Sequence, residues 1–181
     1  SGFSSSFVIM ACHNEKELFN KIMLVNPPSL TRLKQMPSRK DRLLKFALEI
    51  PVFGTLVYHM IISRENVNNM FIEKMYYNPF HVDTVITDAY YESAHKGGYY
   101  AKYLYSSMIS KYMSINISHA VKSLDNSIYI VEGESEPNGG FIVNEYSALN
   151  PAIETSVIAE TKHIPHVEKP DAFLEQVKIF F

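Results

Sequence analysis

The sequence predicts an α/β fold: a small parallel sheet with flanking helices, interrupted by an all-helical segment. Short apolar runs bounded by turn residues occur at residues 22–25, 127–131 and 156–159, as expected of strands buried on both faces. Strand and helix patterns alternate after residue 112, which favours parallel strands with covering helices. Residues 29–112 instead place apolar side chains at helical spacing, which predicts helices alone.

The first elements follow in order from the N-terminus. A turn at residues 2–6 leads into the apolar run 7–11, which predicts a buried helix. The run 22–25 predicts a buried strand that ends at Asn26 and two prolines. Further prolines then divide residues 29–112 into several short helices.

Strand character returns after the helical region. Residues 127–131 predict a strand that enters an acidic turn at 132–137, and residues 141–149 predict a helix. The strand at 156–159 leads into a histidine-containing loop, and Pro170 opens the last helix. We therefore expect an α/β core of residues 1–28 and 113–181 and a helical domain of residues 29–112.

Composition narrows the class of protein. The 181 residues are 46% hydrophobic with a net charge of −2, which excludes a disordered chain and argues against a nucleic-acid partner. The single cysteine, Cys12, forms no internal disulfide, and the longest uncharged apolar stretch, 50–62, is shorter than a membrane span. The histidines show no metal-ligand spacing. We expect a cytoplasmic protein without a secretory signal, membrane span, metal or cofactor.

Three segments at or after the predicted strands carry reactive side chains. They hold, in chain order, a serine before a helix, a carboxylate and a histidine. A serine hydroxyl becomes a nucleophile when an imidazole takes its proton, and a carboxylate fixes the tautomer of that imidazole. The carboxyl ends of parallel strands share one edge of a sheet. The sequence therefore predicts that the three groups meet there.

These segments resemble an α/β-hydrolase with a helical lid. The stretch K-H-I-P-H-V-E-K-P at 162–170 resembles the segment that carries the catalytic histidine, and 130–137 is similar to the strand-turn that carries the triad acid. Residues 24–27 resemble the strand after the nucleophile helix, and 50–54 and 76–79 resemble parts of the lid. The resemblance implies the C-terminal part of an α/β-hydrolase parallel sheet, starting at the nucleophile elbow, with flanking helices and an inserted all-helical lid.

The resemblance also implies site residues and a reaction. Ser4 would be the nucleophile, Glu136 the acid, in competition with Glu132 and Glu134, and His163 the general base, while the backbone N–H of Ser5 would be one oxyanion donor. The implied function is that of a serine hydrolase, esterase-like, which acts on an ester or related acyl small molecule.

Two departures from the family pattern leave an alternative open. The elbow motif is G-x-S-x-G, but Ser6 replaces its final glycine and Phe7 takes the place of a small residue. A register shifted by two residues restores the small residues but puts Gly2 at the nucleophile position. The alternative is a catalytically inactive protein of the same fold that binds a small molecule or a partner.

The chain also lacks counterparts of the strands that precede the elbow in this family. We therefore expect the N-terminal part of the fold, which supplies the second oxyanion donor, as a partner in the same or another polypeptide. The sequence leaves the number of subunits open, a homo-oligomer included.

Overall fold

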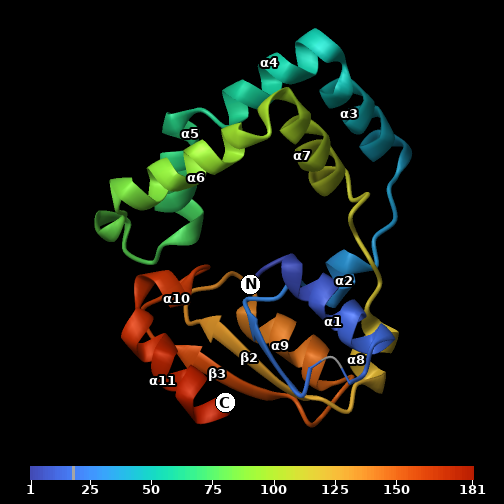
Figure 1. Cartoon of the computed structure of the whole chain (residues 1–181), viewed down its shortest axis with the longest axis vertical. Helices are drawn as coiled ribbons and strands as arrows, with labels where there is room; N and C mark the ends of the chain where they lie inside the picture. Colours follow the sequence, from blue (N-terminus) through green and yellow to red (C-terminus); the bar gives the residue numbers. More distant parts are fainter. Residues whose placement is uncertain (18) are drawn as a thin grey trace. The chain divides into compact units, whose positions relative to one another are not determined.

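The computed structural model describes residues 1–17 and 19–181 and divides them into two compact units (Figure 1). The sheet unit comprises Ser1–Lys34, Met75–Asn78 and Ile115–Phe181, and the helical unit comprises Gln35–Lys74 and Pro79–Ser114. Residues 75–78 fall within the helical domain, 29–112, that the sequence predicts. These residues join the sheet unit because Met75 O accepts the backbone N–H of His163 at 3.0 Å and the N–H of Tyr77 donates to Glu168 at 2.7 Å.

The sheet has three parallel strands in the order β1-β2-β3. They are β1 (Lys21–Val25), β2 (Ser127–Gly133) and β3 (Glu154–Ile158). The predicted parallel arrangement is confirmed, although β3 begins two residues before the predicted strand. Because all three strands run in the same direction, their carboxyl ends meet at one edge.

Helices cover both faces of this sheet (Figure 1). The helices of the sheet unit are α1 (Ser4–Asn14), α2 (Leu30–Leu33), α8 (Ser118–Ser123), α9 (Gly139–Ser147), α10 (Pro165–Glu168) and α11 (Pro170–Phe180). On one face Ile128 and Ile130 of β2 pack with side chains of α1, α2, α8 and α9. On the other face Tyr129 and Val131 pack against α11. Alternate residues of β2 thus face opposite cores, as the pleat requires.

The helical unit contains only helices and turns. Its elements are α3 (Arg39–Glu49), α4 (Pro51–Ile61), α5 (Arg64–Met70), the π-helical turn η1 (Phe71–Met75, whose last residue lies in the sheet unit), the 3₁₀ turns η2 (Pro79–His81) and η3 (Gly98–Tyr100), α6 (Thr84–Lys96) and α7 (Ala101–Ile109). Their starts follow local signals. Ser38 and Asp41 form a capping box at α3, and Pro51 takes the first position of α4.

Helices α3 and α4 meet at a tight corner. A Cβ at Gly54 would lie 1.8 Å from Leu48 O, so only glycine fits there. The buried Lys102 donates to Ile50 O at 3.2 Å, to Pro51 O at 3.2 Å and to Thr55 Oγ1 at 3.1 Å. Ile50 O also accepts the N–H of Gly54 at 2.9 Å, and Pro51 O also accepts the hydroxyl of Thr55 at 2.6 Å, so the ammonium is a second donor to each carbonyl.

In the described part of the chain, no single helix is long and apolar enough to cross a membrane. The pair α3 and α4, bent by 95°, passes the same length and composition test when taken together.

We predict that Lys102→Met destabilises the helical unit by about 2–4 kcal/mol, because it removes the three charge-assisted hydrogen bonds that Lys102 makes at the α3–α4 corner. The free energy of unfolding, measured in urea, checks this. The exposed Lys40 provides the matched control, and Lys40→Met should change that free energy by less than about 0.5 kcal/mol. Equal losses in the two variants would contradict the role of Lys102.

Candidate active site

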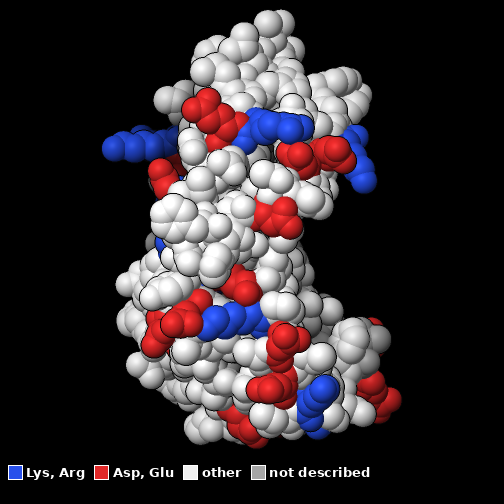
Figure 2. Space-filling model, turned by 90° about the vertical axis from the view of Figure 1, so that its left-hand side faces the viewer, with Lys and Arg blue, Asp and Glu red and all other residues white. Residues whose placement is uncertain are grey.

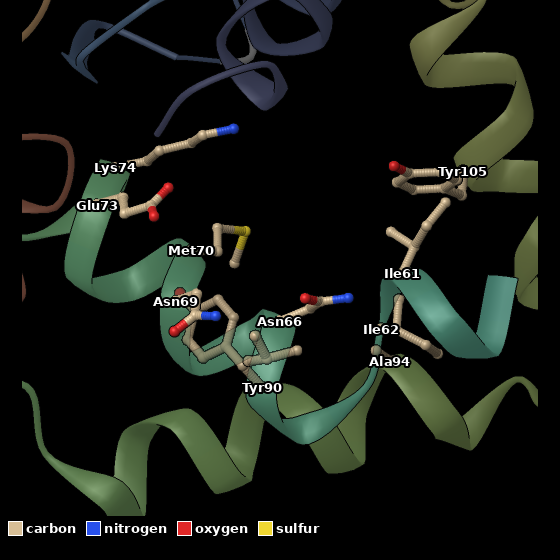
Figure 3. Close-up of a pocket in the computed structure, with 11 residues that line it drawn as sticks. Ile61, Ile62, Asn66, Asn69, Met70, Glu73, Lys74, Tyr90, Ala94 and Tyr105 are labelled. Carbon is tan, nitrogen blue, oxygen red and sulfur yellow. The ribbon is translucent and has the colours of Figure 1, made fainter. Parts of the chain in front are cut away.

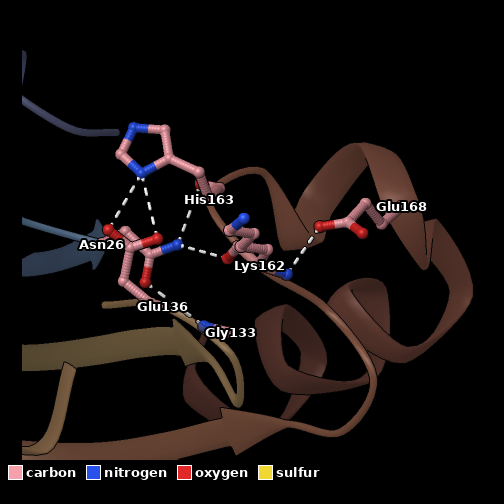
Figure 4. Close-up of polar contacts among 6 residues, drawn as sticks. All are labelled: Asn26, Gly133, Glu136, Lys162, His163 and Glu168. Carbon is pink, nitrogen blue, oxygen red and sulfur yellow. Dashed lines mark hydrogen bonds and ion pairs between the residues drawn. The ribbon is translucent and has the colours of Figure 1, made fainter. Parts of the chain in front are cut away.

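The side chain of Asn26 holds the ends of the strands together (Figure 4). This buried residue directly follows β1, and its Nδ2 donates to Lys162 O at 2.9 Å and to His163 O at 2.8 Å. Its Oδ1 accepts the N–H of Gly133, at the end of β2, at 3.2 Å. One side chain therefore ties β1, β2 and the loop after β3. This role of Asn26 was not predicted from the sequence, where the residue marks only the end of a strand.

Glu136 and His163 meet at this edge of the sheet (Figure 4). The Nδ1 of His163 lies 3.1 Å from each carboxylate oxygen of Glu136. The Glu136 side chain is 14% exposed and that of His163 is 34% exposed. With Nδ1 engaged by the carboxylate, Nε2 is the ring atom that can exchange a proton with a ligand. The structure thus brings together two of the three predicted catalytic residues.

Glu132 and Glu134, the other candidates for the acid that contacts His163, lie in different surroundings from Glu136. Glu134 accepts the backbone N–H of Glu160 at 2.9 Å and so holds the turn after β3. Burial raises the pKa of the Glu132 carboxyl, and the nearby charge of Glu136 raises it further. Glu168 braces the histidine loop by accepting the N–H of Lys162 at 2.6 Å.

Gly2, rather than Ser4, has the left-handed backbone of an elbow tip. Its φ is +53°, its N–H donates to Val25 O at 2.9 Å, and a Cβ built on it would lie 3.8 Å from His163 Nε2. A side chain at position 2 would therefore face the imidazole. This geometry corresponds to the shifted elbow register of the sequence analysis, in which Gly2 takes the nucleophile position and small residues follow it.

Ser4 and Ser5 do not take the positions that the elbow interpretation gave them. Ser4 is the first residue of α1, with its side chain exposed, and no contact between Ser4 and His163 is present in the described residues. The N–H of Ser5 donates to Gly2 O at 3.1 Å because the first helical turn closes there, so it is not free to bind an oxyanion. The catalytic role of Ser4 stays a prediction.

Other candidate groups in the sheet unit do not add to this chemistry. Cys12 is buried in α1, and burial raises the pKa of its thiol, which disfavours the reactive thiolate. Within residues 1–17 and 19–181, no group of three or more His, Cys, Asp or Glu side chains could hold a metal ion.

The helical unit holds a cavity of its own, of about 510 Å³ (Figure 3). Most of its wall is apolar, with two amides and two phenols. Glu73 and Lys74, both on the π-helical turn, add opposite charges at one end (Figure 3). The lining residues are Ile61, Ile62, Asn66, Val67, Asn69, Met70, Glu73, Lys74, Tyr90, Ala94 and Tyr105. Its size and lining are those of pockets that bind small organic molecules.

No protein-family model matches the sequence, and neither does any curated protein. Solved structures match it over nearly its whole length. One is 2-hydroxy-6-oxo-6-phenylhexa-2,4-dienoate hydrolase from Rhodococcus sp. strain RHA1, with 14% identity and a TM-score of 0.70 over 100% of this chain and 62% of that one.

Two further structures give the same result. A meta-cleavage product hydrolase from Pseudomonas fluorescens IP01 has 17% identity and a TM-score of 0.68, covering 98% of this chain and 61% of its own. A serine hydrolase from Cycloclasticus zankles has 14% identity and a TM-score of 0.69, covering 100% and 62%. The fold is therefore that of the C-terminal portion of an α/β-hydrolase. The chain spans about three fifths of the length of these proteins.

We predict that Asn26→Ala costs about 2–3 kcal/mol of stability, because a buried amide and three carbonyl or N–H partners lose their bonds. It should also speed hydrogen exchange at the N–H of His163, which a merely global loss of stability would not single out. Asn20→Ala, at an exposed position, is the control. Unchanged exchange at His163 would contradict a positioning role.

A second prediction concerns pH. Because the pKa of Glu132 is raised in the folded protein, its ionisation costs stability as pH rises through the range above the unfolded carboxyl pKa of about 4.3. Glu132→Gln should therefore be more stable than the parent protein at pH 7, and the difference should vanish below about pH 4. Thermal unfolding at both pH values measures it, with Glu175→Gln, on an exposed surface, as the control. A destabilised variant at pH 7 would refute it.

Proposed function

We propose that this protein binds a small molecule in a lidded pocket of the α/β-hydrolase type and forms no acyl-serine at its elbow. The observation that carries the proposal is Gly2, whose missing side chain would face His163 Nε2 from 3.8 Å at the Cβ. A nucleophilic side chain at this position would lie beside Nε2, the atom that would take its proton. Glycine has only a hydrogen atom there and no nucleophilic group. In this proposal the helical unit acts as the lid.

The His163–Glu136 pair gives the pocket its polar specificity. Glu136 holds Nδ1 at 3.1 Å and stabilises the imidazolium, so Nε2 can accept a proton or a hydrogen bond from a hydroxyl of the ligand. The space that a serine side chain would fill is left to the ligand itself. A ligand with an acidic hydroxyl beside an apolar body fits this arrangement.

A second candidate function is the esterase-like serine hydrolase with Ser4, Glu136 and His163 as its triad. One observation favours it: the hydrogen-bonded pair of His163 and Glu136 has the contact that a triad base needs. Ser4 lies two residues after Gly2, exposed on the first turn of α1. In this candidate it attacks the carbonyl carbon and His163 takes its proton.

Both functions need a partner in the sheet. Within the described residues β1 pairs only with β2, so one edge of β1 is open to further strands. We propose that the N-terminal part of the fold pairs there and supplies the second oxyanion donor.

A fluorophosphonate, which traps activated serines, distinguishes the two candidates. With the N-terminal part of the fold present, we predict that the parent protein and Ser4→Ala remain unlabelled, whereas Gly2→Ser becomes labelled at position 2. Adding His163→Ala to Gly2→Ser should lower the labelling rate by about 100-fold or more, the usual contribution of a general base. Intact mass and peptide mapping give the site.

The opposite pattern supports the second candidate. Labelling of the parent protein at Ser4, lost in Ser4→Ala, would overturn the proposal of a non-nucleophilic elbow. A Gly2→Ser variant that stays folded but unlabelled would contradict the position assigned to residue 2.

A further inference from the structure

The helical unit exposes large apolar side chains on α3 and α4. Six of them form a surface that we call the apolar cap: Leu43, Phe46, Val52, Phe53, Leu56 and Met60. No charged residue occurs from position 50 to position 62. Figure 2 shows the part of the unit that carries α4 as uncharged, with acidic and basic side chains gathered below it. Contiguous apolar surfaces of this kind mark interaction sites.

Helical spacing makes the α4 part of the cap continuous. Val52, Leu56 and Met60 follow one another at intervals of four along α4 and therefore share a face. Gly54 and Tyr58, on the other side of α4, are buried within the unit. The side of α4 that packs within the helical unit is therefore the side opposite the cap. The cap itself is not needed for the core of the unit.

The polar groups beneath the cap are satisfied within the unit. Thr55 Oγ1 donates to Pro51 O at 2.6 Å, and Tyr58 OH donates to Ala94 O at 2.9 Å. Lys102 turns its ammonium inward onto the carbonyls at the α3–α4 corner. The exposed His59 stacks on His95 at 5.5 Å. Hydrocarbon requires polar groups satisfied in this way, whereas protein interfaces usually carry one hydrogen bond per 100–200 Å².

Two tyrosines lie at the border of the cap, on a unit with a small excess of cationic residues. Tyr99 and Tyr103 share with Val52 and Leu56 an open, mostly apolar groove of about 610 Å³, and both tyrosines are exposed. Amphipathic rings of this kind suit the level of lipid headgroups. The helical unit has 9 Lys and Arg against 7 Asp and Glu, and the sheet unit has 8 against 12. The unit with the cap is therefore the cationic one.

We propose that the apolar cap docks on a phospholipid bilayer and lies in the interface between headgroups and acyl chains. The charge-free stripe of α4 enters the acyl boundary, and the tyrosines stay at headgroup level. A bilayer is favoured over a protein partner because none of the six side chains of the cap has a hydrogen-bonding group. This inference is independent of the chemistry at His163.

The sequence contains no tryptophan, so all tryptophan fluorescence of a variant comes from the one residue introduced. In full-length Phe53→Trp, phosphatidylcholine vesicles should shift the fluorescence to shorter wavelength, and brominated lipids should quench it. Phe141→Trp is the matched control, because Phe141 on α9 is 59% exposed and Phe53 is 56% exposed. An unshifted Phe53→Trp in excess lipid, or an equal shift in Phe141→Trp, would overturn the proposal.

Vesicle flotation provides the second test. Phe53→Asp combined with Leu56→Asp should lower the vesicle-bound to free ratio by about tenfold or more, because two apolar side chains lose their place in the acyl boundary. Phe141→Asp combined with Ile179→Asp, both on the sheet unit, should leave it unchanged. If the parent protein instead dimerises without lipid and the cap variant is a monomer, the cap binds a second copy and the bilayer proposal fails.

Discussion

The amide of Asn26 is the interaction on which the geometry of the site depends. Parallel strands bring their carboxyl ends to one edge, but they do not by themselves fix the loops that follow. Asn26 fixes them by donating to two consecutive carbonyls and accepting from the end of β2. The same region is packed so closely that a Cβ at Gly133 would lie 2.0 Å from Lys162 O. The backbone of His163 is therefore fixed by Asn26, independently of the contact between its side chain and Glu136.

With the base so held, the identity of residue 2 decides what the site can do. The imidazole needs a fixed tautomer to act as a base, and the carboxylate of Glu136 supplies it through Nδ1. That arrangement is the same whether the proton comes from a serine of the protein or from a hydroxyl of the ligand. The proposed function takes the second source, because Gly2, at the position that faces Nε2, carries no oxygen in its side chain.

Local signals made much of this predictable from sequence. The apolar runs predicted the three strands, and Pro170 predicted the start of α11. The parallel arrangement of the strands then predicted that Glu136 and His163 lie close together. The partners of Asn26 were not predictable, because they lie 136 and 137 residues further along the chain. The same holds for Met75–Asn78, which joins the sheet unit through its contacts with the histidine loop. The motif did not decide between the two elbow registers, because each satisfies only part of it, whereas the positive φ of Gly2 is visible only in the structure.

The helical unit follows a different constraint from the sheet unit. A sheet buries its apolar faces under helices, and α1, α9 and α11 do so here. The cap on α3 and α4 instead leaves its apolar side chains exposed, while Lys102 of α7 directs its ammonium onto the corner between these two helices. Burying an ammonium is costly unless its donors are matched, and here Ile50 O, Pro51 O and Thr55 Oγ1 accept from it. The proposed contact with a bilayer would exclude water from this corner, and an ammonium that already has three acceptors within the unit would lose none of them on docking.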